Sequence, residues 1–150
     1  MSFLRDGLVL VPWDSSESAM AAIRAAVEIA GERSRIRAIH VIDPPPRLYG
    51  EIAWPPGGKE AILQKVRDEF EQSLPAEWKG IHLETVFGNP GNEIVQYAKR
   101  LPAGLIVIST HGRTGLLHFA MGSVAERVVR LAPCPVLVLR SQAGPQSAVN

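Results

Sequence analysis

The sequence predicts an α/β fold: a single open, doubly wound sheet of five mainly parallel strands. Short apolar runs alternate along the chain with segments whose apolar residues recur at helical spacing. Turn-forming residues separate these segments, and the alternation is typical of βαβ units with helices on both faces of a sheet. A chain of 150 residues is long enough to bury a core, and we expect one domain over 1–150.

The composition narrows the classes of function. The chain has 16 Lys and Arg against 15 Asp and Glu, a formal net charge of +1, which argues against a general nucleic-acid or membrane-surface binder. No apolar run approaches the roughly 20 residues that span a bilayer, and the N-terminus lacks the basic leader of a signal peptide. The single cysteine, Cys134, excludes an internal disulfide and a multi-cysteine metal site. We therefore expect a cytoplasmic protein.

The first strand is predicted over 7–11, where a short apolar run ends at Pro12. Asp14, Ser15 and Ser16 offer caps for a helix that continues to Ala30, with small and apolar residues on one face.

The second strand is predicted over Ile36–Ile42. The prolines and glycines of 43–58 forbid regular structure there, and a connection this long is either functional or mobile. A helix is expected from Lys59, followed by a third strand over 81–87 with period-two alternation.

The second half of the chain repeats this pattern. The turn 88–92 leads into a helix, and the fourth strand, 105–108, leads into a Gly-rich loop, 109–122. The remaining predicted segments are a helix over Ser123–Leu131, a fifth strand over Val136–Leu139 and a flexible polar tail over 141–150.

Ligands of such sheets bind beyond the carboxyl ends of the strands, where the strand order reverses. The loop after the fourth strand lies there, and Gly112 and Gly122 permit close backbone approaches. Gly122-Ser123 stands where a helix begins, and exposed N–H groups at a helix start bind phosphate readily. Ser123 with Glu126 also fits a capping box, in which Ser123 is the N-cap and needs no ligand. Both interpretations stand at this point.

The sequence resembles the universal stress protein family. The likeness lies in Val9-Leu-Val-Pro-Trp-Asp-Ser-Ser, in His40-Val-Ile-Asp, and in the stretch from Leu105 to Gly115. It continues in Met121-Gly-Ser-Val-Ala-Glu-Arg and in Cys134-Pro-Val-Leu-Val-Leu, so it covers about residues 6–140. The resemblance implies the strand order 3-2-1-4-5. Chain 1–150 would then be a single universal stress protein domain.

ATP-binding members of that family carry G-x-x-G, nine residues, then G-[ST]. Gly112 and Gly122-Ser123 match the second half with its spacing, whereas Ser109 stands in place of the first glycine. The resemblance implies a regulatory or sensing module that binds ATP or a related adenine nucleotide, with or without Mg²⁺. It also implies these binding residues: Pro12, Asp14 and Val41 at the adenine and ribose, Ser109 and Thr110 near the ribose, and Gly112, Arg113, Gly122, Ser123 and Val124 around the phosphates.

Simpler interpretations compete at several of these positions. Asp14 is also a common helix-capping residue, Val41 a core residue and Arg113 a solvated loop arginine. Without cysteines or carboxylates at ligand spacing near His111 and His118, we expect no metal site. His40 and His82 are expected at the edge or surface, and Cys134 is expected to be structural.

Two alternatives to a nucleotide-binding module remain. One is a slow ATPase, although hydrolysis usually needs a water-positioning group and the Gly-rich loop holds no carboxylate. The other is a nucleotide-free dimeric scaffold whose segment 43–58, with Tyr49 and Trp54, binds a protein; the same segment could be a lid over the nucleotide or disordered. Ser109 is the best support for the scaffold.

The fifth strand predicts a homodimer. Val136–Leu139 contains no charge or proline, and as the last strand it is expected at the sheet edge. Pairing with the same strand of a second chain about a two-fold axis would satisfy this edge, and the family resemblance implies such dimers too.

Overall fold

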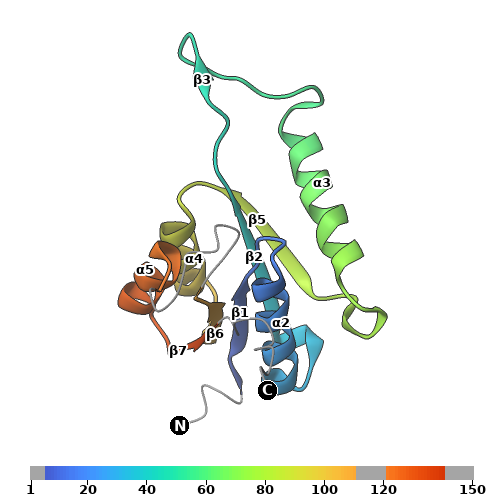
Figure 1. Ribbon diagram of the computed structural model, residues 1–150, viewed down its shortest axis with the longest axis vertical. Helices are drawn as coiled ribbons and strands as arrows, with labels where there is room; N and C mark the ends of the chain where they lie inside the picture. Colours follow the sequence, from blue (N-terminus) through green and yellow to red (C-terminus); the bar gives the residue numbers. More distant parts are fainter. Residues whose placement is uncertain (1–5, 111–120, 141–150) are drawn as a thin grey trace, which may run out of the picture.

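The structure is a computed structural model that describes residues 6–110 and 121–140. Two predicted site residues, Gly112 and Arg113, and the predicted tail 141–150 lie outside these described residues. One five-stranded, all-parallel sheet organises the described chain, in the order β5-β2-β1-β6-β7 (Figure 1). Its strands are β1 (Leu8–Pro12), β2 (Ile36–Ile42), β5 (His82–Phe87), β6 (Ala103–Ser109) and β7 (Val136–Leu139).

This topology confirms the predicted fold. Numbering the five sheet strands along the chain gives 3-2-1-4-5, so the order reverses between β1 and β6. The carboxyl ends of these two strands therefore diverge toward their connections on opposite sides, which opens a crevice above the sheet.

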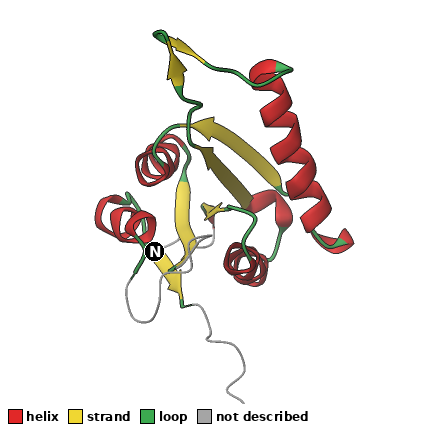
Figure 2. Cartoon of the chain, turned by 45° about the horizontal axis from the view of Figure 1, so that its top comes forward, coloured by secondary structure: helices red, strands yellow, loops and turns green. Residues whose placement is uncertain are grey.

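Helices cover both faces of the sheet (Figure 2). They are α2 (Glu17–Ala30), α3 (Gly58–Ser73), α4 (Pro90–Arg100) and α5 (Ser123–Leu131), with short 3₁₀ turns η1 (Arg33–Arg35) and η2 (Ala76–Trp78). Helices α2 and α3 lie on one side of the sheet, and α4 and α5 lie on the other (Figure 1).

Each face has its own apolar core. Residues on alternate positions of β1 point to opposite faces: Val9 and Val11 pack with α2 and α3, whereas Leu10 packs with α4 and α5. Phe70 of α3 and Ile106 of β6 are fully buried in the two cores. Burial on both faces explains why these strands are continuous apolar runs rather than alternating ones.

Local sequence explains where the helices begin. The Ser16 hydroxyl caps α2 by accepting a hydrogen bond from the Ala19 N–H (3.1 Å), and Asn89 caps α4 by accepting from the Asn92 N–H (3.1 Å). Pro90 follows Asn89 at the first turn of α4, where a missing N–H costs nothing.

The prediction that segment 43–58 has no regular structure is wrong. The segment contains a hairpin of β3 (Arg47–Leu48) and β4 (Glu51–Ile52). Tyr49 and Gly50 join the strands with φ of 52° and 86°, and positive φ at both positions is what a type I′ hairpin turn requires. The prolines flank this hairpin and do not interrupt it. The hairpin projects from the domain at the top of Figure 1.

Three strands of the sheet differ slightly from their predicted bounds, and one of them, β5, begins at His82 and not at Ile81. β1 ends at Pro12 and not before it. The next residue, Trp13, donates its N–H to the Ile39 carbonyl (2.8 Å). β6 runs from Ala103 to Ser109, so Ser109 ends the strand and does not begin the loop. No helix within the described residues is long and apolar enough to cross a membrane.

Candidate functional site

A cavity of about 330 Å³ lies at the carboxyl ends of β1, β2 and β6, and we call it the strand-end cavity. Its floor and walls are largely apolar, and α4 and α5 close one side. The lining residues are Pro12, Trp13, Asp14, Ala19, Ile39, Val41, Asp43, Pro90, Ile94, Ile108, Ser109, Thr110, Gly122, Ser123, Val124 and Ala125. Every predicted site residue within the described chain is among them, so the structure brings eight of the ten together.

Asp14 stands where β1 leads into α2. Its Oδ1 accepts hydrogen bonds from the Ser16 N–H (3.1 Å) and from the Ser16 hydroxyl (2.5 Å). Ser16, not Asp14, is the helix cap. Asp14 thus orients the cap while its carboxylate lines the strand-end cavity, which makes it a positioned acceptor beside any ligand there.

The exit of β6 and the start of α5 are tied together through the backbone. The Thr110 N–H donates to the Leu139 carbonyl (2.9 Å), and the Gly122 N–H donates to the Thr110 carbonyl (2.9 Å). A Cβ at Gly122 would stand 2.9 Å from that same carbonyl oxygen. Glycine is therefore required here by the close approach of two backbones.

The capping box predicted Ser123 as the N-cap of α5, and the structure differs. Gly122 is the N-cap, no side chain caps this helix, and Ser123 is its first helical residue. The box fails because the Gly122–Thr110 backbone bond fixes the helix start one residue earlier. Ser123 is exposed, and the first turn of α5, whose N–H groups have no acceptor within the helix, lines the strand-end cavity.

Sequence reasoning missed two side chains below the site. Trp13 is buried and packs edge-on against Phe70 (ring centroids 5.0 Å apart), and its indole Nε1 has no hydrogen-bond partner within the described residues. His40 was expected at the edge or surface, but it is half-buried. Its Nδ1 lies 2.7 Å from the Trp13 carbonyl. His82 is exposed on β5, at the sheet edge, as predicted.

The projecting hairpin does not cover the strand-end cavity in this structure. Of residues 43–58, only Asp43 lines the cavity. Leu48 and Tyr49 at the hairpin tip are exposed, while Trp54 packs edge-on against Phe87 of β5 (5.5 Å).

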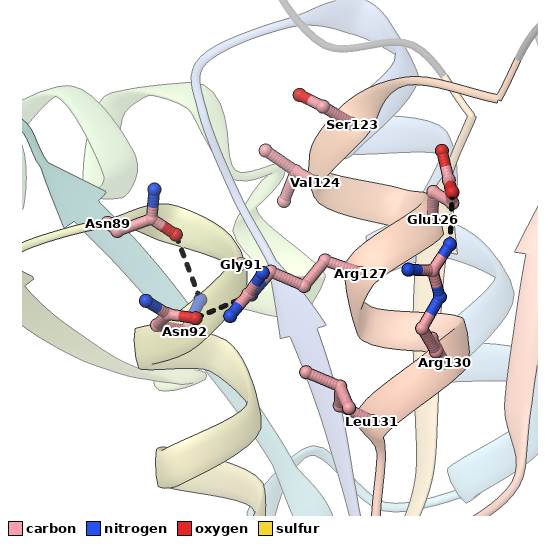
Figure 3. Close-up of a pocket in the computed structure, with 9 residues that line it drawn as sticks. All are labelled: Asn89, Gly91, Asn92, Ser123, Val124, Glu126, Arg127, Arg130 and Leu131. Carbon is pink, nitrogen blue, oxygen red and sulfur yellow. Dashed lines mark hydrogen bonds and ion pairs between the residues drawn. The ribbon is translucent and has the colours of Figure 1, made fainter.

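A second cavity, of about 370 Å³, opens between the start of α4 and the length of α5 (Figure 3), and we call it the inter-helix cavity. It shares Ser123 and Val124 with the strand-end cavity. Its other lining residues are Asn89, Gly91, Asn92, Glu126, Arg127, Arg130 and Leu131. Within residues 6–110 and 121–140, no cluster of histidine, cysteine and carboxylate side chains is suited to hold a metal ion.

Comparison of the sequence with models of known protein families identifies the family of this chain. The family model described as the universal stress protein family matches residues 8–140. The chain belongs to the universal stress protein family.

Individual universal stress proteins are similar over most of the chain. One from Methanocaldococcus jannaschii is 38% identical, with 88% of this chain and 81% of that protein covered. YxiE of Bacillus subtilis is 32% identical, with 88% and 97% covered. The solved structure of UspA from Lactobacillus plantarum superposes with a TM-score of 0.65 at 29% identity, covering 91% of this chain and 99% of that one.

Cys134, in the loop that precedes β7 of this universal stress protein, carries a testable property. Burial raises the pKa of its thiol above the ordinary value, because the charged thiolate loses solvation. Reactivity follows the thiolate, so we expect the alkylation rate of Cys134 to rise at higher pH in the folded protein than in the urea-unfolded chain. The stability that the neutral thiol contributes is complete below the unfolded pKa and is lost as pH rises through the folded pKa.

The measurement is the midpoint of the rate–pH curve for alkylation. The midpoint is used because access alone changes the rate without moving the midpoint. Since Cys134 is the single cysteine of the chain, no second thiol contributes. A folded midpoint at or below the unfolded one would contradict the expectation.

Proposed function

We propose that this universal stress protein binds ATP or a related adenine nucleotide and serves as a regulatory or sensing module in the stress response. The observation that carries the proposal is the strand-end cavity, which joins an apolar chamber to the N-terminus of α5. An apolar chamber suits a base, and the N-terminus of a helix suits phosphate.

We assign a role to each lining residue from its position in the cavity. Val41 and Ile94 offer apolar contacts to the adenine, and Pro12 shapes the chamber floor. The Asp14 carboxylate and the polar groups of Ser109 and Thr110 are placed for the ribose. The N–H groups of Ser123 and Val124 and the Ser123 hydroxyl are placed for phosphate, with Gly112 and Arg113 as further candidates from the loop.

One solved universal stress protein supports the ligand class. It was determined in complex with cAMP, and this chain shares its fold with a TM-score of 0.56 at 24% identity. An adenine nucleotide is thus compatible with this architecture. Ser109, which replaces a motif glycine, lines the cavity at the end of β6 and leaves the chamber open.

Co-purifying nucleotide tests the proposal. Protein purified without added nucleotide is quenched in acid and spun, and the supernatant is separated by chromatography for adenine nucleotides. We expect ATP or a related adenine nucleotide in the supernatant, and no free phosphate accumulating when the protein is incubated with ATP and Mg²⁺. Phosphate release that Asp14→Ala abolishes would instead favour the slow ATPase.

We further propose a homodimer through β7. This strand is one of the two edges of the five-stranded sheet, and Leu137 on it is 37% exposed. Light scattering at tens of micromolar should give a dimer mass, and Leu137→Lys should shift it toward the monomer because a charge would be buried at the pairing edge. Lys99→Gln, on an exposed helix end, serves as the control. A monodisperse wild-type monomer would overturn the dimer.

A further inference from the structure

The inter-helix cavity borders the strand-end cavity at the N-terminus of α5. The two cavities share Ser123 and Val124, the residues proposed to hold phosphate. A ligand whose phosphates reach Ser123 would therefore stand at the border of the inter-helix cavity, where the next lining side chains along α5 are Glu126, Arg127 and Arg130.

The guanidinium of Arg127 is fixed in this cavity (Figure 3). Its Nε donates to the Asn92 Oδ1 (2.5 Å), and the Asn92 N–H donates to the Asn89 Oδ1, which caps α4. Gly91 makes room for the arginine stem, since a Cβ at Gly91 would stand 2.8 Å from the Arg127 Cδ. The side chain is thus anchored across the start of α4 by one hydrogen bond and by a glycine.

The charge of Arg127 is not neutralised by any carboxylate of the described chain within ion-pair distance. Its neighbour Arg130 differs, because the Arg130 Nη2 lies 2.5 Å from the Glu126 Oε1. Arg127 therefore presents the terminal N–H groups of its planar fork to the cavity, and such a fork matches phosphate oxygens in two-point contacts.

We propose that the inter-helix cavity binds the terminal phosphate of the nucleotide and that Arg127 determines specificity for phosphate-chain length. The ligand class is then the nucleoside di- and triphosphates, in preference to monophosphates and cyclic monophosphates, whose single phosphate ends at Ser123. This inference rests on the proposed nucleotide site in the strand-end cavity.

Binding constants for a series of adenine nucleotides test the inference. ATP, ADP, AMP and cAMP are titrated by calorimetry into the wild type, Arg127→Gln, Arg127→Lys and the control Lys99→Gln. The wild type and Lys99→Gln should bind ATP about tenfold more tightly than AMP, because one charge-assisted contact contributes about that factor to affinity. Arg127→Gln should remove this preference, and Arg127→Lys should restore part of it through charge without the fork.

The outcomes separate the two proposals. A wild type that binds all four nucleotides equally, or an Arg127→Gln protein that keeps the preference for ATP, would overturn the role of Arg127 and leave the nucleotide site intact. A wild type that binds none of them would overturn the proposed function itself. Thermal melts of each variant show whether it is folded, and a folded Arg127→Lys decides the question if Arg127→Gln does not fold.

Discussion

Replacing Gly122 with valine should weaken ATP binding by about 100-fold or more, the loss expected when two charge-assisted phosphate contacts are broken. The reason is geometric. A Cβ at this position would stand 2.9 Å from the Thr110 carbonyl oxygen, and that oxygen belongs to backbone that cannot swing aside like a flexible side chain. The β6 exit and the α5 N-terminus must then separate, which moves the N–H groups of Ser123 and Val124 away from the phosphates.

The matched control for this variant is Met121→Val. It introduces the same side chain one residue earlier, at an exposed position outside both cavities. Met121→Val should retain wild-type affinity, and both variants should show a cooperative thermal transition. Undiminished ATP affinity in a folded Gly122→Val protein would contradict the placement of the phosphates at α5.

Replacing Phe70 with alanine should lower the free energy of unfolding by about 3–5 kcal/mol, the usual range for emptying a buried aromatic site. Phe70 is fully buried, and its ring meets the Trp13 ring edge-on at 5.0 Å. The rest of this core cannot easily refill the space, because residues such as Val11 and Ile23 are held in a strand and a helix.

Urea unfolding followed by circular dichroism measures this change, with Glu69→Ala on the solvent-facing side of the same helix as the control. The control should stay within about 0.5 kcal/mol of the wild type. A Phe70→Ala protein as stable as the control would mean that α3 does not pack on the sheet as described.

Sequence patterns predicted the sheet well for a physical reason. Each central strand is buried on both faces, so its apolar run is continuous and ends sharply at polar or turn residues. Helical stripes such as Ile94 and Ala98 then identified the covering helices, and both residues are buried in the core. The carboxyl-end rule for parallel sheets pointed to the loop after the fourth strand, and Ser109, Thr110 and Gly122 of that segment line the strand-end cavity.

The failures arose where a long-range contact overrides a local pattern. The capping box at Ser123 is a local motif, but the bond from Gly122 to Thr110, twelve positions earlier, sets the start of α5. His40 has no local signal for burial, and the Trp13 carbonyl that it contacts comes from the residue that follows β1. The hairpin at 47–52 was hidden because prolines and glycines dominate the segment, while Tyr49 adopts a positive φ that sequence does not favour.

Arg127 shows the same limit at the level of function. The local spacing of Arg127 on α5 is typical of a solvated helix face and indicates no chemical role. The structure places it against Asn92 of a different helix, in a cavity that meets the proposed phosphate site. Its contact with α4 depends on Gly91, which is distant in the sequence, and no local motif contains that information.

The central claim is that the strand-end cavity binds an adenine nucleotide, and a calorimetric titration of ATP into nucleotide-free wild-type protein tests it most directly. We expect a saturable heat with one nucleotide bound per chain. Absence of binding heat, at several temperatures and with or without Mg²⁺, would contradict the claim and would direct attention to the β7 edge and the projecting hairpin as surfaces for a protein partner.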